Sequence, residues 1–294
     1  MASKSKPRRP QLLSSTRPAP TTKPSGALSS RHSRSLIRGH HTLRKNLRVA
    51  IAKKDAERAR ELELRIEEAG GMEQYQQASI QGQSVERGGD SSKVLVEWLE
   101  QVRASSLVSE PSDDRPRLLE VGALRADNAC AQSKMFEVER IDLRSQHPSI
   151  RQQDFMERPV PATEKLPDEG FDILSLSLVL NFVDDAYSRG KMLKRTRPFL
   201  RDSYRSSNQY EDIFPSLFLV LPAPCVENSR YLNVPKLENI MEDLGFVLAR
   251  SKKSSKLVYF LWRYEGSGRS PDGRLKKEEV RSGKTRNNFA IELR

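Results

Sequence analysis

Two acidic residues and a glycine follow two short apolar segments in the middle of the chain. Glu120 and Gly122 lie at the end of the segment 117–124 (RLLEVGAL), and Asp142 lies near the end of 136–143 (FEVERIDL). Each segment is typical of a buried strand that leads into a tight turn. A glycine lets a ligand approach the backbone, and a carboxylate at the carboxyl end of the next strand can accept both hydrogen bonds of a ribose diol. The spacing therefore predicts a site for a nucleoside-containing cofactor.

The segments that must position these residues alternate between strand-like and helix-like patterns. Residues 171–180 form the most apolar run and suit the central strand of a sheet, and residues 92–104 carry apolar side chains, including Trp98, at helical spacing. Further strands are predicted over 150–154, 216–221, 246–249 and 256–262, and further helices over 181–200 and 234–245. This order predicts an α/β fold with a Rossmann-like, doubly wound sheet, helices on both faces and a closing antiparallel pair.

The glycine pattern narrows the choice of cofactor. A nicotinamide cofactor would require G-x-G-x-x-G in the first turn, whereas Gly122 is followed by Ala123, Leu124 and Arg125. No strand is followed by the Gly-Lys-Ser/Thr of a P-loop. One close glycine followed by acids after successive strands fits S-adenosylmethionine (SAM), and the sheet suits a class I SAM-dependent methyltransferase.

Each predicted cofactor residue receives its own role. Glu120 is expected near the sulfonium and amino acid end, Asp142 on the ribose hydroxyls and Asp154 on the adenine amino group. Gly122 is expected to give close access to the backbone, and Phe155, which follows Asp154, is included in the cofactor site. Each acid taken alone could equally be a solvated loop carboxylate.

The basic residues are concentrated towards the two ends of the chain. Of 294 residues with a net charge of +12, residues 1–54 contain 14 Lys and Arg and no acid. Residues 266–294 contain 8 basic and 4 acidic residues, which leaves 29 basic and 35 acidic residues for 55–265. Such a basic block favours nucleic-acid binding or a nuclear address, although a solvated tail is an alternative.

Composition divides the chain into four expected regions. A single helix is predicted over 42–69, with Thr42 as its cap and Gly70 beyond its end. The four regions are a disordered basic tail (1–41), a helical N-terminal extension (42–108), the methyltransferase domain (109–265) and a disordered basic C-terminal tail (266–294).

Several kinds of site and segment are not expected. Cys130 and Cys225 are too few for a disulfide framework and lack zinc-ligand spacing, and three of the four histidines lie in the basic tail. No metal site is therefore predicted. The N-terminus lacks the apolar stretch of a signal peptide, and no segment approaches about 18 consecutive apolar residues. We expect a soluble, intracellular protein without membrane contact.

At these motifs the chain resembles the fungal 25S rRNA adenine-N(1) methyltransferase family. The resemblance runs from about Gly70 to Arg263, and neither tail is covered. It is carried by RLLEVGAL, FEVERIDL, QQDF, FDILSLSLVLNFV with the following Asp184-Asp185 and Arg189-Gly190, and YQQAS with RGGDSSK upstream. The resemblance implies SAM-dependent methylation of N(1) of one adenine in large-subunit rRNA, in the nucleus and nucleolus, with the pre-ribosomal particle as partner. The family's cofactor positions correspond to Gly122 and Asp142.

The target suggests what the catalytic residues must do. Adenine N(1) lies on the Watson–Crick edge, so the base must be unpaired or flipped out, and the enzyme needs positioning more than a strong base. Ser177 and Asn181 follow the predicted central strand, where class I enzymes place substrate contacts, and an Asn amide can pair with an adenine edge. Asn181 could instead cap the next helix. The absence of Asp/Asn-Pro-Pro-Tyr argues against methylation of the exocyclic amine.

Two other functions are compatible with the cofactor motifs. A metazoan relative of this family acts as a SAM sensor in the TOR kinase pathway without methyltransferase activity, and a small-molecule or protein methyltransferase is a second alternative. The acid-free basic arm favours the RNA enzyme over the sensor. We expect a monomer.

Overall fold

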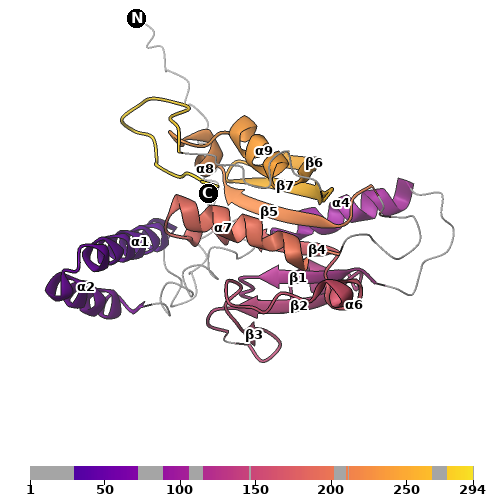
Figure 1. Cartoon of the computed structure of the whole chain (residues 1–294), viewed down its shortest axis with the longest axis horizontal. Coiled ribbons are helices and arrows are strands. Elements are labelled where there is room, and N and C mark those ends of the chain that lie inside the picture. Colours follow the sequence, from indigo (N-terminus) through magenta and orange to yellow (C-terminus); the bar gives the residue numbers. More distant parts are fainter. Residues whose placement is uncertain are drawn as a thin grey trace, which may run out of the picture.

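The structure is a computed structural model, and it describes residues 30–71, 89–105, 115–145, 147–201, 210, 212–266 and 277–293 (Figure 1). The α-helices are α1 (Ser30–Ala52), α2 (Ala56–Glu68), α4 (Ser92–Ser105), α5 (Ala129–Gln132), α6 (Leu166–Glu169), α7 (Ala186–Thr196), α8 (Pro224–Glu227) and α9 (Val234–Asp243). The strands are β1 (Arg117–Val121), β2 (Glu137–Asp142), β3 (Arg151–Gln152), β4 (Ile173–Ser177), β5 (Ser216–Pro222), β6 (Phe246–Lys253) and β7 (Leu257–Tyr264). Short 3-10 helices span Thr163–Lys165, Leu180–Phe182 and Arg197–Phe199.

The seven strands form one sheet in the order β3-β2-β1-β4-β5-β7-β6. The first five are parallel, and β7 runs antiparallel to both β5 and β6. The predicted central strand is β4, and the predicted closing pair is β6 and β7. The chain order reverses between β1 and β4, so the carboxyl ends of these two strands mark the expected ligand crevice. The predicted class I methyltransferase fold is confirmed.

Successive side chains of the strands point to opposite faces of the sheet and belong to two separate hydrophobic cores. Leu119 and Leu174 belong to the core that includes α7 and α9, whereas Leu118 and Phe218 belong to the core that includes α4. Trp98 of α4 meets Phe218 edge-on, with ring centroids 6.1 Å apart, so the prediction that Trp98 is a core residue is confirmed. Helices cover both faces, with α4 behind the sheet and α7 in front of it in Figure 1.

The N-terminal helices differ from the prediction of one helix over 42–69. Helix α1 begins at Ser30, so the boundary predicted after residue 41 falls inside it, and Thr42 is an internal residue. The chain turns at Lys54, which has a positive φ of 58°, and Asp55 then caps α2 by accepting a hydrogen bond from the Arg58 backbone N–H. The left-handed residue Lys54 therefore follows the end of α1, and the cap Asp55 starts α2. The helix propensity of the whole stretch, which predicted one helix, does not show this break.

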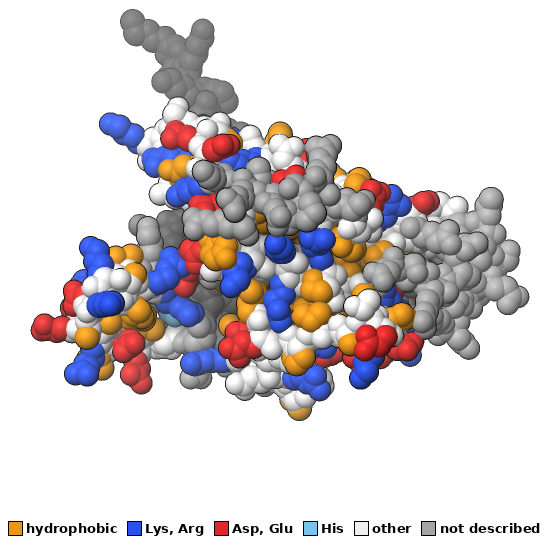
Figure 2. Space-filling model, viewed as in Figure 1, with side chains coloured by type: hydrophobic (Ala, Val, Ile, Leu, Met, Phe, Trp, Pro, Cys, Tyr) orange, Lys and Arg blue, Asp and Glu red, His pale blue; other side chains and the backbone are white. Residues whose placement is uncertain are grey.

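The two helices pack on each other and project from the sheet as a separate lobe (Figure 1). Figure 2 shows Lys and Arg side chains on this lobe and on the adjoining face of the body. Residues 1–29 and 72–88, which include the rest of the predicted tail and part of the predicted extension, lie outside the described residues.

The prediction of a disordered C-terminal tail over 266–294 is wrong for residues 277–293. Four apolar side chains near the end of the chain are at most 9% exposed and belong to the core or lie against it: Phe289, Ala290, Ile291 and Leu293. The Glu292 backbone N–H donates to the Ala186 carbonyl of α7 at 2.9 Å. The prediction rests on the basic composition of the segment and overlooks its short apolar motif, 289–293. Burial of this motif offsets the entropic cost of ordering the segment.

Candidate active site

The loops after β1, β2 and β4 meet at the carboxyl edge of the sheet. The Gly122 backbone N–H donates to the Ile141 carbonyl at 2.8 Å, which ties the β1 loop to the end of β2. Gly122 has a positive φ of 73°, and a Cβ atom there would lie 2.6 Å from Cγ2 of Val179. A side chain at position 122 would therefore be strained and would displace the loop after β4. Gly122 lets these three loops approach one another.

Asp142 is the last residue of β2, and Asp154 follows the adjacent strand, β3. The Asp142 Oδ1 atom accepts a hydrogen bond from the Arg144 backbone N–H at 2.8 Å, and Asp154 Oδ1 accepts one from Met156 at 2.7 Å. Burial raises the pKa of the Asp142 carboxyl above its ordinary value, although the Arg144 hydrogen bond opposes this. A carboxylate oriented by the backbone at the end of β2 is suited to accept hydrogen bonds from ribose hydroxyls.

Glu120 lies at this edge but already has partners. Its Oε1 atom accepts a hydrogen bond from Asn128 Nδ2 at 2.6 Å, and its Oε2 atom lies 3.3 Å from Nε of Arg140 on β2. Burial raises the pKa of the Glu120 carboxyl, although Asn128 and Arg140 oppose this. Among the described residues, Glu120 Oε2 and the Arg140 Nε and Nη2 atoms are buried without a hydrogen bond of good geometry. Glu120 therefore supports the β1 loop through Asn128, and its predicted place at the amino acid end of the cofactor stays a prediction.

Phe155 does not have the surroundings that its predicted role requires. Its side chain is 3% exposed and lies in the core, with its ring centroid 5.3 Å from that of Phe199. Phe155 is predicted in the cofactor site because it follows Asp154 in the sequence. In the structure its side chain packs in the core and leaves almost no surface for a ligand.

Ser177 and Asn181 bracket a strained turn at the mouth of β4. Leu178, the residue between strand and turn, has a positive φ of 58°, which is unusual for a side chain of this kind and is a recurrent feature of functional sites. Ser177 Oγ lies 2.7 Å from Ser91 Oγ, and Asn181 belongs to the 3-10 helix Leu180–Phe182. The alternative that Asn181 caps the following helix is wrong, because Asp185 caps α7 by accepting from the Ser188 N–H at 2.9 Å.

The Asn181 side chain presents an unused acceptor. Its Oδ1 atom is buried and has no hydrogen-bond partner among the described residues. A buried acceptor without a partner is costly and calls for an explanation, such as a ligand that completes the site. The exocyclic amine of adenine is a donor of the required polarity.

The loop before α4 contributes residues to this edge that the sequence did not assign to the site. Besides the Ser91–Ser177 contact, Asp90 accepts hydrogen bonds from the Ser92 N–H at 2.9 Å and from the Ala129 N–H at 2.5 Å. Asp90 therefore fastens the start of α4 to the start of α5. In the sequence, the feature that could have indicated this role is the polar run Asp90-Ser91-Ser92 at the start of an amphipathic helix.

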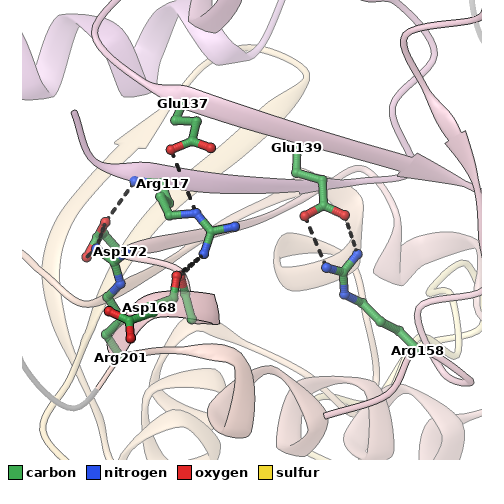
Figure 3. A network of polar contacts seen from close by, with 8 residues as sticks. Arg117, Glu137, Glu139, Arg158, Asp168, Asp172 and Arg201 are labelled. Atoms are coloured by element: carbon green, nitrogen blue, oxygen red, sulfur yellow. Dashed lines mark hydrogen bonds and ion pairs between the residues drawn. The ribbon is translucent and has the colours of Figure 1, made fainter. Parts of the chain in front are cut away.

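The amino edge of the sheet carries a second polar network, shown in Figure 3. Asp172 is fully buried, accepting from the Arg117 N–H at 2.7 Å and from Arg201 Nη1 at 2.9 and 3.1 Å. Arg158 makes a two-pronged ion pair with Glu139, at 2.6 and 3.1 Å. The Asp172 contacts lie at the opposite ends of the strands from Gly122 and Asp142, whereas Glu139 lies in the middle of β2, opposite Leu119 of β1. Both sets of contacts support the sheet and not the candidate site.

The described residues contain neither a metal-binding cluster nor a membrane-spanning helix. No group of three or more His, Cys, Asp or Glu side chains among them could hold a metal ion. None of the helices in this part of the chain is long and apolar enough to cross a membrane.

Comparison with known proteins identifies relatives along most of the chain. Residues 60–291 match the model of the family described as 25S rRNA (adenine(2142)-N(1))-methyltransferase, Bmt2. The 25S rRNA adenine-N(1) methyltransferase of Schizosaccharomyces pombe is 39% identical over 261 residues, covering 87% of this chain and 89% of the relative. The 25S rRNA (adenine(2142)-N(1))-methyltransferase of Saccharomyces cerevisiae is 38% identical over 229 residues, covering 78% of this chain and 61% of the relative.

Solved structures with a similar chain path are more distant. The 16S rRNA methylase RmtB has a TM-score of 0.41 at 11% identity, covering 79% of this chain and 98% of its own. Magnesium protoporphyrin IX methyltransferase from Synechocystis with bound SAM has a TM-score of 0.37 at 10% identity, covering 58% of this chain and 79% of its own. The sequence relatives and the family match settle the assignment: this chain belongs to the 25S rRNA adenine-N(1) methyltransferase family.

Proposed function

We propose that this protein transfers a methyl group from SAM to N(1) of an unpaired adenine in 25S rRNA. The observation that carries the proposal is the meeting of Gly122, Asp142 and Asn181 at one edge of the sheet in a chain of this family. Gly122 and Asp142 provide the close backbone and the ribose acceptor, and Asn181 provides an acceptor for the base. Both curated relatives are named as rRNA methyltransferases, which supports an enzyme over a SAM sensor.

The residues of the site have distinct tasks in this reaction. Bound SAM would supply an electrophilic methyl group. Adenine N(1) already has a free lone pair, so the protein needs no strong base to make it nucleophilic. Asp142 would accept hydrogen bonds from the ribose, with Asp154 as the candidate acceptor for the cofactor's adenine amine. Asn181 Oδ1 would accept from the exocyclic amine of the target base and leave N(1) free to react. Ser177, held by Ser91, would line the mouth of β4 beside it.

The RNA would be guided to this site by the basic N-terminal helices. Helix α1 contains six Lys and Arg and no acid. Arg48 of α1 lies 3.0 Å from Asp185, four residues beyond Asn181, so the basic helix lies beside the candidate site. Phosphate contacts of this kind give affinity that depends on salt but not on base sequence.

Truncation tests the role of the basic arm. Deleting residues 1–54 should weaken RNA binding and flatten the dependence of log K on log salt, because fewer counterions are released. Deleting 1–29 alone leaves α1 and is the matched control, with a smaller change in slope. An unchanged salt slope after deletion of 1–54 would show that the arm is only an address.

The cellular setting follows from the same proposal. Methylation of large-subunit rRNA places the protein in ribosome biogenesis, with the pre-ribosomal particle as partner and the nucleus and nucleolus as its location. The basic arm would serve both RNA binding and nuclear entry, and the protein would act as a monomer.

The decisive experiment measures 1-methyladenosine in 25S rRNA nucleosides by mass spectrometry. Cells without this protein should lose one modified adenine per 25S rRNA, and the wild-type gene should restore it. The Asp142→Leu variant at equal abundance should not. Unchanged 1-methyladenosine in cells without the protein would refute the proposed reaction.

A further inference from the structure

The C-terminal segment 287–293 lies along the first turns of α7. The Glu292 backbone N–H donates to the Ala186 carbonyl at 2.9 Å, and Ala186 is the first residue of α7. A Cβ atom on Gly190 would lie 1.8 Å from the Glu292 carbonyl oxygen. The two backbones are therefore so close that no side chain fits at position 190 without displacing the segment.

Arg189 connects this segment to the turn that precedes α7. Its side chain is 9% exposed, and its Nη1 atom donates to the Ala290 carbonyl at 2.8 Å. Its Nη2 atom donates to the Asp184 carbonyl at 3.3 Å, and the guanidinium lies 4.2 Å from the centre of the Phe289 ring. Burial lowers the pKa of Arg189 to about 10, so the side chain remains charged at neutral pH.

The turn held by Arg189 is the one that carries Asn181. It begins at the left-handed residue Leu178, whose N–H donates to the Val220 carbonyl of β5 at 3.0 Å. The 3-10 helix within it is closed by Phe182 N–H to Val179 at 2.9 Å and by a longer bond from Val183 N–H to Leu180 at 3.3 Å. Asp184 follows directly. The turn is thus fixed to β5 at one end and, through Arg189, to the C-terminal segment at the other.

We propose that Arg189 is a positioning residue, which uses the C-terminal segment to hold the Asn181 turn against the end of β4. The inference rests on the proposed function, because it assigns to Arg189 the placement of the side chain that contacts the target base. A misplacement of about 1 Å at a reacting group can lower a rate a hundredfold, so a small shift of this turn would be felt in methyl transfer.

Three variants of the full chain test this assignment. Arg189→Met removes both donors, and Arg189→Lys keeps the charge but offers one nitrogen in place of a planar fork. Lys194→Met removes an exposed cation from the same helix and is the matched control. The measurements are SAM affinity by calorimetry, the single-turnover rate of 25S rRNA methylation at saturating SAM and RNA, and hydrogen exchange of peptides from the turn and from β1.

The expected results separate positioning from folding. Arg189→Met should retain SAM affinity within about twofold and lose about ten- to a hundredfold in single-turnover rate. Its 178–185 peptide should exchange faster while the β1 peptide is unchanged. Arg189→Lys should be intermediate, and Lys194→Met should match the wild type.

Other results would overturn the assignment. A normal single-turnover rate in Arg189→Met would do so. A joint loss of SAM affinity, of methylation rate and of hydrogen-exchange protection in the β1 peptide would also do so, because it would indicate general unfolding. A wild type that methylates no rRNA would refute the proposed function instead, and the exchange data would still show whether Arg189 holds the turn.

Discussion

The two edges of the sheet carry polar side chains that are paired in different ways. At the amino edge, both oxygens of buried Asp172 are hydrogen-bonded, to Arg117 and to Arg201. At the carboxyl edge, buried polar atoms of Glu120, Arg140 and Asn181 have no well-formed hydrogen bond among the described residues. The amino edge also has such atoms, among them Arg201 Nε and Ser216 Oγ. What distinguishes it is that the buried carboxylate there, Asp172, is paired at both oxygens.

This difference separates a structural network from a site prepared for ligands. A buried carboxylate with all its hydrogen bonds satisfied holds strands together and leaves nothing for a ligand to bind. Unsatisfied groups beside a left-handed residue such as Leu178 cost stability and persist where function requires them. Substitutions at the two edges should therefore affect different measurements.

Asp172→Asn should give the largest loss of stability. It leaves the buried Arg201 guanidinium without its counter-charge, which costs about 3–5 kcal/mol in the free energy of unfolding. Urea unfolding measures this, and Glu137→Gln, an exposed acid 3.9 Å from Arg117, is the control with a change of about 0.5 kcal/mol or less. SAM affinity per folded molecule should not change in Asp172→Asn. A large drop in that affinity would end the distinction between the two edges.

Asp142→Leu should lower SAM affinity about ten- to a hundredfold with little effect on folding. The cofactor's ribose hydroxyls would be left without an acceptor, at a cost of about 1–3 kcal/mol. Calorimetry with SAM and S-adenosylhomocysteine measures the effect, and Glu157→Leu, an exposed acid after β3, is the control. Wild-type affinity in folded Asp142→Leu would remove Asp142 from the cofactor site.

Asn181→Ala should leave SAM binding intact and slow methyl transfer. Loss of one polar contact to the base costs about 1–3 kcal/mol, or roughly ten- to a hundredfold in rate. The variant should not lose stability, because it removes a buried acceptor that has no partner among the described residues. Single-turnover rates and thermal melts on the same preparation decide the matter: a normal rate would exclude contact with the base.

Asp185→Ala, four residues further on, should show the smallest effect. In contrast to Asn181→Ala, it should lower stability and not the rate of methyl transfer. Asp185 caps α7 by accepting from the Ser188 N–H at 2.9 Å, so its loss should cost about 1 kcal/mol of stability. Molecules that remain folded should turn over at a near-normal rate. If Asp185→Ala slows methylation as much as Asn181→Ala while remaining folded, the two neighbours share a role and the assignment of Asn181 is not specific.

The sequence by itself determined the architecture and the edge at which the site lies. Strand alternation is a local property with a period of two, so segments such as 117–121 and 173–177 could be identified from their own residues. Parallel strands bring their carboxyl ends to one edge, so Gly122, Asp142 and Asn181 could be grouped without a structure. Local pattern and topology were sufficient for that grouping.

The tertiary structure decided which of the predicted site residues are engaged by other parts of the protein and which remain available to a ligand. Glu120 meets Arg140 through strand register, and Phe155 enters the core because Phe199 packs on it. The C-terminal segment, basic in composition, folds because its apolar side chains find α7 a hundred residues away, with Gly190 leaving room for the backbone of Glu292. Such contacts depend on partners distant in sequence, whose packing no local pattern encodes.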